Sequence, residues 1–161
     1  MSVCDHVPLD IKIVTCVDVV GNRDMQCLCA APYPNHKHGC PNYGKKDGCP
    51  PNIPYFPDVY DTEGVHLIAQ DIQFGEYLRL FKIKHPTWTD RQLRNPLYWQ
   101  TYFRARFRAS VEHRKPDGYD VLYTPEAMGV DVTATCKKAG INLEWPPTEH
   151  TFMVALYARR R

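Results

Sequence analysis

Four of the chain's seven cysteines lie together in one short segment that is rich in proline and glycine. These cysteines, with the two histidines between them, are Cys27, Cys29, His36, His38, Cys40 and Cys49. Proline and glycine disfavour regular helices and strands, and they let a backbone wrap closely around a compact object. Thiolates and imidazoles are metal ligands. We therefore expect this segment to fold around a metal ion or a metal cluster, and no other feature constrains the fold as strongly.

The bulk composition is that of one soluble domain. A chain of 161 residues can bury most of the surface that its unfolded form exposes, so residues 1–161 are expected to form a single domain. Hydrophobic residues make up 43% and charged residues 24%, and no apolar run approaches the roughly 18 residues that suggest a membrane span. The net charge of +2 is too small to indicate nucleic acid or an anionic membrane as a partner.

The amino-terminal sequence favours a cytoplasmic location. Met-Ser-Val-Cys-Asp-His lacks a basic region followed by an apolar stretch, so it does not resemble a secretory signal. Cytoplasmic thiols are normally kept reduced, and clustered cysteines there favour metal binding or catalysis over disulfides. The odd number of cysteines agrees with this interpretation.

Apolar stretches rich in β-branched residues predict strands on both sides of the cysteine segment. They cover residues 11–20, 65–70 and 152–157, and residues 121–124 form a shorter extended piece. With the helices described next, these strands predict an α/β (α+β) fold: a single compact domain with a mixed sheet. The cysteine segment, about residues 22–57, is the N-terminal metal-binding loop of this domain.

Helical patterns occupy much of the remainder. Residues 74–85 predict a helix that Pro86 ends. Thr89 and Gln92 fit a capping box, in which two side chains satisfy free backbone N–H groups at a helix start. A helical segment then covers about residues 89–115, in which Pro96 either kinks the helix or opens a second one. The part after Pro96 is a long amphipathic helix with an apolar stripe. The stripe consists of Trp99, Phe103, Phe107 and Val111.

The spacing of the clustered cysteines suits an iron–sulfur cluster better than zinc. The pattern is C-x-C, ten residues, C, eight residues, C, which differs from the paired C-x2-C knuckles of ordinary zinc fingers. A cluster needs thiolates spread around a larger object, and the prolines after Cys40 and Cys49 resemble the Cys-Pro step common at cluster ligands. We predict a 4Fe–4S cluster, with zinc as the alternative and with His36 or His38 as substitutes for a thiol.

The other three cysteines have simpler explanations. Cys16 alternates with apolar residues in the predicted strand 11–20, so we interpret it as a core residue and a less favoured ligand. Cys136 lies on a predicted short helix, and Cys4 lies in a terminus that we expect to be mobile. Either one could serve as a reserve ligand.

Two motifs further along the chain are specific enough to compare with a known family. The first is Cys40-Pro-Asn-Tyr-Gly-Lys45 followed by Cys49-Pro-Pro51, and the second is Pro125-Glu-Ala-Met-Gly-Val-Asp-Val132. With these motifs the chain resembles the domain of unknown function 2284, a family described only as predicted metal-binding proteins. The resemblance covers most of the chain from about Cys27 onward. It implies metal binding rather than a particular reaction, with Cys40 and Cys49 as ligands and with Tyr43, Gly44 and Lys45 as cofactor contacts.

The chain departs from that family in two places. Members usually carry a further cysteine-rich cluster before the second motif, whereas residues 110–124 contain no cysteine here. They also tend to have a cysteine a few residues before the Cys-Pro step, where this chain has His36 and His38. The resemblance therefore implies one metal centre, in which Cys27, Cys29 or a histidine replaces that ligand.

Two acidic residues of the second motif have structural explanations. Asp131 is expected to cap a short helix over residues 132–139, which Gly140 ends in the left-handed conformation. Glu126 could bridge to a lysine on the surface. Catalysis by either carboxylate is a weaker hypothesis.

The cysteine segment supports one main functional hypothesis, a cytoplasmic protein with a redox or sulfur-chemistry role. Its partner would be a redox protein or a small-molecule substrate. If only three cysteines bind the cluster, the open position could bind a substrate. Lys45, Lys46 or His38 could then donate protons or bind an anion.

Two other functions compete with it. The first is a zinc-stabilised module that binds nucleic acid or a protein partner through basic and aromatic residues. These residues are Arg91, Arg94, Tyr98, Trp99, Tyr102, Phe103, Arg104, Arg106, Arg108, Arg114 and Lys115. Core spacing of the aromatic stripe explains much of this pattern without nucleic acid. The second is an enzyme with Cys27 or Cys29 as nucleophile beside His36, for which no orienting third residue is recognisable.

Overall fold

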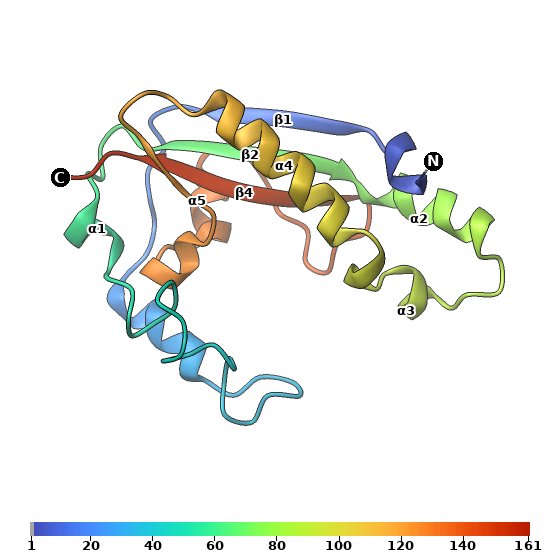
Figure 1. Cartoon of the computed structure of the whole chain (residues 1–161), viewed down its shortest axis with the longest axis horizontal. Helices are drawn as coiled ribbons and strands as arrows, with labels where there is room; N and C mark the ends of the chain where they lie inside the picture. Colours follow the sequence, from blue (N-terminus) through green and yellow to red (C-terminus); the bar gives the residue numbers. More distant parts are fainter. Residues whose placement is uncertain (1) are drawn as a thin grey trace.

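A computed structural model describes residues 2–161 of the chain. Its centre is a four-stranded sheet with the strand order β1-β2-β4-β3 (Figure 1). The strands are β1 (Leu9–Val14), β2 (His66–Gln73), β3 (Asp120–Leu122) and β4 (His150–Ala158). The compact α+β domain is confirmed, and the sheet is antiparallel throughout where the sequence predicts a mixed one.

Strand β2 lies inside the sheet, between β1 and β4. Six consecutive residues, from Leu67 to Ile72, are buried, because elements pack on both faces of the sheet. A strand that is covered on both sides loses the alternation of apolar and polar residues. This explains why the apolar run at residues 65–70 predicts the strand although its pattern does not alternate.

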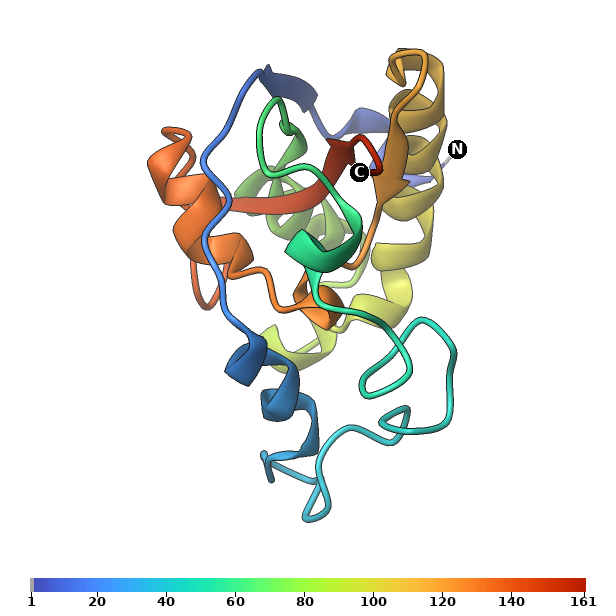
Figure 2. The same ribbon diagram turned by 90° about the vertical axis from the view of Figure 1, so that its left-hand side faces the viewer.

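One face of the sheet is covered by the long helix α4 (Gln100–Arg114). Figure 2 shows α4 on one side of the sheet and α5 on the other. The predicted apolar stripe is confirmed, since all four of its residues are buried. Phe107 and Val111 pack against Ile68 and Tyr157 of the sheet, and the Tyr157 hydroxyl donates a hydrogen bond to the Val111 carbonyl at 2.7 Å.

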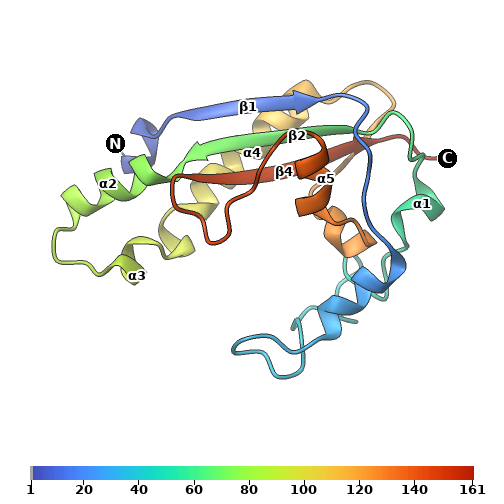
Figure 3. The same ribbon diagram turned by 180° about the vertical axis from the view of Figure 1, so that it is seen from behind.

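Three short helices cover part of the opposite face, as Figure 3 shows for α1 and α5. They are α1 (Phe56–Val59), the 3₁₀ helix η4 (Pro125–Met128) and α5 (Val132–Lys138). The predicted cap of α5 is confirmed, because the Asp131 carboxylate accepts a hydrogen bond from the Ala134 N–H at 2.8 Å. Gly140 follows α5 with φ of +85°, the predicted left-handed conformation.

Aromatic side chains fill the end of the sheet at which β2 continues directly into α2 (Phe74–Lys84). The elements packed there are the 3₁₀ helix η1 (Val3–His6), α3 (Asp90–Leu93) and the 3₁₀ helix η3 (Pro96–Tyr98). The capping box at Thr89 and Gln92 is confirmed, with the Thr89 N–H donating to the Gln92 side chain at 2.8 Å. Pro96 opens η3 rather than continuing α3.

The first strand differs from its prediction. It covers Leu9–Val14 and ends before Cys16, which lies at a bend with φ of +53° and is exposed. The interpretation of Cys16 as a core residue of a strand over residues 11–20 is therefore wrong. The chain turns at this bend because Val17 then packs in the core, with its N–H donating to the Val65 carbonyl at 2.8 Å.

Residues 22–53, which we call the cysteine arm, project from the sheet on the side of α5 (Figure 1). The arm contains an eight-residue 3₁₀ helix, η2 (Arg23–Ala30), followed by a series of turns. The predicted loop over residues 22–57 thus contains a helix, and its last residues begin α1. Neither η2 nor these turns form a strand of the sheet.

Candidate metal centre

The base of the cysteine arm is fixed to the motif around Gly129. The Asn22 N–H donates to the Gly129 carbonyl at 3.0 Å, and the Asp131 N–H donates to the Val20 carbonyl at 2.7 Å. Gly129 has φ of +85°, and a Cβ there would lie 2.6 Å from the Asn22 oxygen. Only glycine fits this position without strain, because it tolerates both the left-handed backbone and the close contact.

A glutamine side chain ties the arm together at its base. The Gln26 amide donates hydrogen bonds to the Ala127 carbonyl at 3.0 Å and to the Ile53 carbonyl at 3.1 Å. These contacts connect η2 with η4 and with the returning end of the arm. Arg23 adds a salt bridge to Asp58, in which one guanidinium nitrogen donates to both carboxylate oxygens, at 2.6 and 2.7 Å.

The middle of the arm folds back onto the end of η2. The Cys40 N–H donates to the Cys29 carbonyl at 2.7 Å. Gly39 precedes this contact with φ of +80°, and a Cβ on it would lie 2.6 Å from the Ala30 backbone. The close approach of the two segments, which glycine permits, brings Cys29 and Cys40 into one neighbourhood.

The first of the two motifs, from Cys40 to Pro51, forms consecutive turns. The Gly44 N–H donates to the Pro50 carbonyl at 2.8 Å, and the Cys49 N–H donates to the Lys46 carbonyl at 3.1 Å. Gly44 again has a positive φ, of +70°. These bonds fold the Tyr-Gly-Lys turn back onto Cys49 and its prolines.

Three thiols and one carboxylate lie close enough for their charges to interact. Cys29, Cys40 and Cys49 are each partly buried. Burial raises the pKa of the Cys29 thiol, and the negative charges of Cys40, Cys49 and Glu126 raise it further. The structure thus brings together three of the four predicted cysteine ligands.

The side chain of Cys27 points to a different side of η2 from that of Cys29. Its thiol is exposed, and it belongs to the same 3₁₀ helix as Cys29. A 3₁₀ helix has three residues per turn, so side chains two positions apart point to different sides. Cys27 therefore does not share the side of η2 that Cys29 presents.

Glu126 is a residue whose position the sequence interpretation missed. It makes no salt bridge to a lysine among residues 2–161, although the sequence suggests one. Its side chain reaches solvent, yet the surrounding protein raises the pKa of its carboxyl by burial. Its membership of the second motif was the only available signal, since η4 lies far from the cysteines in the sequence.

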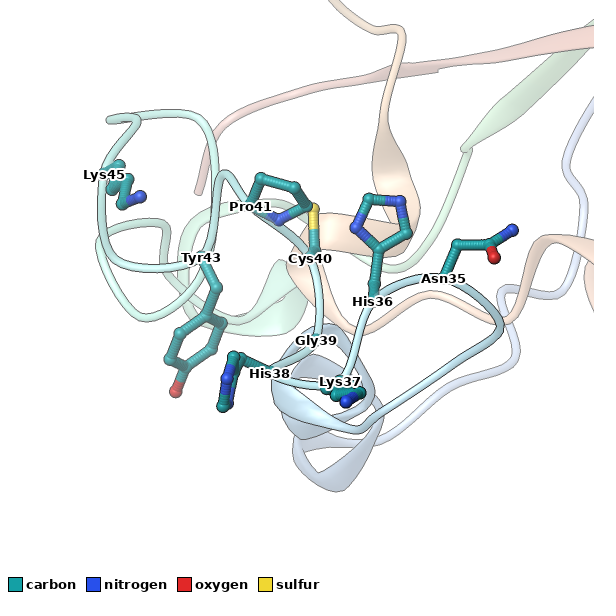
Figure 4. Close-up of a pocket in the computed structure, with 9 residues that line it drawn as sticks. All are labelled: Asn35, His36, Lys37, His38, Gly39, Cys40, Pro41, Tyr43 and Lys45. Atoms are coloured by element: carbon teal, nitrogen blue, oxygen red, sulfur yellow. The ribbon is translucent and has the colours of Figure 1, made fainter.

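An open cavity of about 590 Å³ lies beside Cys40. Its lining residues are Asn35, His36, Lys37, His38, Gly39, Cys40, Pro41, Tyr43 and Lys45. In the view of Figure 4 the His36 ring and the Cys40 thiol point to one side of the loop, and His38 and Tyr43 point to the other. The predicted residues Tyr43 and Lys45 thus share a cavity with Cys40, whereas Gly44 is not part of the lining.

The described chain holds no preformed site for a single ion. Among residues 2–161, no group of three or more histidine, cysteine, aspartate or glutamate side chains converges closely enough to coordinate one metal ion. His36 stacks on Tyr33 with the ring centroids 4.5 Å apart. The three neighbouring thiols therefore do not form such a group in the described part of the chain.

The remaining cysteines lie outside the arm. Cys136 lies on the buried side of α5 and is 0% exposed, and burial raises its pKa to about 11. Cys4 is buried in η1, so the prediction of a mobile terminus is wrong at this residue. Burial also raises the pKa of the Cys4 thiol. The exposed Cys16 lies near His66, whose Nδ1 accepts a hydrogen bond from the Cys16 N–H at 3.1 Å.

Comparison of the chain with family models, with curated proteins and with solved structures finds no match. The resemblance to the domain of unknown function 2284 therefore stays a prediction. None of the helices in the described part of the chain is both long enough and apolar enough to cross a membrane.

Proposed function

We propose that the cysteine arm holds one iron–sulfur cluster, of the 4Fe–4S type, through Cys29, Cys40 and Cys49. The observation that carries the proposal is the hydrogen bond from the Cys40 N–H to the Cys29 carbonyl at 2.7 Å, which brings these two cysteines together. Cys49 adds to this pair, because its charge contributes to the raised pKa of the Cys29 thiol. Three cysteine ligands leave one iron for Cys27 or for a substrate. The protein would act in redox or sulfur chemistry, with a redox protein or a small molecule as its partner.

The spread of the thiols favours a cluster over zinc. Zinc binds sulfur at about 2.3 Å, so the sulfurs of a tetrahedral site lie only about 3.8 Å apart. In a cluster each thiolate binds its own iron, and the sulfurs lie further apart. The charges of Cys29, Cys40 and Cys49 interact, but these residues do not form a group that could hold a single metal ion. Such an arrangement suits an iron–sulfur cluster better than a zinc ion.

Basic residues in the arm support an anionic cofactor. A cluster bound by thiolates carries net negative charge, which nearby cations stabilise. Residues 22–53 contain four lysines and arginines against two aspartates. Lys45 lines the cavity beside Cys40, so it can bind an anionic substrate there.

A bound cluster would supply one-electron transfer, or Lewis acidity at an open iron. The chain's own residues would position a substrate and handle protons. The open cavity beside Cys40 would hold the substrate, with Lys37 and Lys45 binding its negative charge. Burial raises the pKa of the Glu126 carboxyl, which makes its carboxylate a better proton acceptor beside Cys29 than an ordinary glutamate.

Anaerobic reconstitution with iron and sulfide tests the proposal. We expect visible absorbance from the cluster in the wild-type protein and in Cys16→Ser, and its loss in Cys40→Ser and Cys49→Ser. Cys27→Ser separates the two possibilities for the fourth iron, because an altered spectrum assigns Cys27 as its ligand. Retention of the full cluster in both Cys40→Ser and Cys49→Ser would contradict the ligand assignment.

The alternative outcome is a zinc-stabilised binding module. Metal analysis that finds stoichiometric zinc after purification, and no cluster after reconstitution, would replace the iron–sulfur proposal with this one. Salt-sensitive binding to RNA or DNA would then identify nucleic acid as the partner.

A further inference from the structure

A second cavity, of about 340 Å³, lies between η1 and the helices that follow β2. Its lining residues are Ser2, Val3, Cys4, Tyr77, Phe81, Lys84, His85, Trp88 and Tyr98. Most of these residues belong to η1 and α2, which lie at the end of the sheet away from the cysteine arm (Figure 1). Its volume falls at the lower end of the range of roughly 300–1,000 Å³ that is typical of small-molecule sites.

The walls of this cavity are mostly flat aromatic rings. His85 stacks on Trp88 with centroids 4.0 Å apart, and Trp88 lies 4.9 Å from Tyr98. Phe81 meets Trp88 edge-on at 5.4 Å. Aromatic rings favour offset stacking and edge-to-face contacts with other rings. The walls therefore favour a ligand with a planar aromatic ring.

The Tyr77 side chain gives this cavity an unused hydrogen-bond donor. Tyr77 is 0% exposed, and its hydroxyl is the one buried side-chain polar atom without a partner in the part of the chain that the structure describes. Burial raises the pKa of this hydroxyl well above its ordinary value, and the negative charges of Cys4 and Tyr98 add to the rise. Tyr77 lines the cavity together with Cys4 and Tyr98, and its hydroxyl stays protonated. A buried donor without a partner is costly, so its retention calls for an explanation.

The outer part of the cavity carries positive charge. Lys84 lines it and is exposed, and no aspartate or glutamate is among the lining residues. The neighbouring Lys82 is engaged elsewhere, because its ammonium donates to the Trp88 carbonyl at 2.8 Å. An anionic group is therefore favoured near Lys84, and a neutral acceptor is favoured near Tyr77, because burying an unpaired charge is costly.

We propose that this cavity binds a small planar aromatic acid that carries an oxygen atom opposite its carboxylate. The ring packs against Trp88 and Tyr98, the carboxylate lies near Lys84, and the oxygen accepts a hydrogen bond from the Tyr77 hydroxyl. The hydroxyl is buried in the unliganded protein, so binding requires a shift of the lining side chains that cover it. The site is independent of the metal centre.

Calorimetric titration with three related probes tests the assignment. The probes are 4-hydroxybenzoate, benzoate, which lacks the inner oxygen, and 4-hydroxybenzamide, which lacks the charge. We expect 4-hydroxybenzoate to bind roughly tenfold more tightly than benzoate, because only it gives the buried hydroxyl a partner. The amide should bind roughly threefold more weakly than 4-hydroxybenzoate, since an exposed ion pair contributes little.

Two variants test separately the contacts that the probes make with Tyr77 and with Lys84. Tyr77→Phe should remove the preference for 4-hydroxybenzoate over benzoate while the protein stays as resistant to urea as the wild type, because the lost hydroxyl has no partner. Lys84→Gln, a surface change that leaves the core intact, should remove the preference for the acid over the amide, and Lys115→Gln serves as its matched control. Absence of binding by all three probes, or a preference for the hydroxyl that persists in Tyr77→Phe, would overturn the proposal.

Discussion

Strand β2 and helix η2 have the same length of eight residues but opposite burial. Six residues of β2 are buried, whereas η2 has none. β2 is held by side chains that pack on both faces of the sheet. η2 is held by backbone contacts at glycines and by the Gln26 amide.

The difference shows that the two regions have different sources of order. Burial of apolar surface contributes about 25 cal/mol per Å², and it is the main driving force for the sheet. The cysteine arm has little such surface to bury, and small structures of this kind usually depend on a metal or on disulfides. A metal centre would supply the missing free energy, as it does in other small metal-binding modules.

The largest expected loss of stability comes from truncating a side chain that is buried at the end of the sheet. Phe103 of α4 is 0% exposed and belongs to the aromatic cluster at the end of the sheet. Phe103→Ala should lower the free energy of unfolding by about 3–5 kcal/mol, because it removes buried area and leaves a cavity. Urea denaturation measures this loss. In the control Leu97→Ala, which alters a side chain that is 76% exposed, the change should stay within about 0.5 kcal/mol.

A smaller loss of stability is expected at the base of the cysteine arm. Gly129→Ala should lower the free energy of unfolding by about 2–3 kcal/mol, because its φ is positive and its Cβ would meet the Asn22 oxygen. Gly118→Ala is the matched control: it has φ of +80° but no atom within 4 Å of the added Cβ, so it should cost only about 1 kcal/mol. Equal losses in the two variants would show that the contact with Asn22 does not hold the arm.

Loading the metal centre should stabilise the arm more than the sheet. Hydrogen exchange of backbone amides in residues 22–53 should slow by roughly tenfold or more on reconstitution, which corresponds to about 1.4 kcal/mol of local stability. Amides of β2 should change little, because their protection comes from packing. Equal slowing in both regions would instead indicate that the arm and the sheet open together.

The smallest effect concerns the loop before β4. Hydrogen bonds from Thr148, with its hydroxyl at 2.7 Å, lower the pKa of Glu144 to about 2. Since the folded-state pKa lies below the ordinary value of 4.5, the stabilisation is fully present above that pH and is lost as the pH falls towards 2. The side chain is near the surface, so the contribution should be below about 1 kcal/mol. Glu144→Gln should remove this part of the acid dependence of unfolding, and an unchanged dependence would contradict the assignment.

Local patterns predicted most of the regular elements. The capping box at Thr89, the cap at Asp131 and the stripe from Trp99 to Val111 depend on residues a few positions apart, and all three are confirmed. Cys16 was mispredicted because its alternation with valines is the same in a strand and in a bend that leads to the core. The 3₁₀ helix η2 went unpredicted because local propensities favour short helices of this kind only weakly.

The sequence by itself determined the composition of the arm: its cysteines, its histidines, and the glycines and prolines that keep it irregular. It also determined the caps and the apolar stripe, because these follow from interactions between near neighbours in the chain. Only the tertiary structure decided which groups meet. It placed Glu126 beside Cys29, turned Cys27 away from the other thiols and left the Tyr77 hydroxyl without a partner. Such encounters between distant segments depend on how the whole sheet and its covering helices pack, which no local pattern encodes.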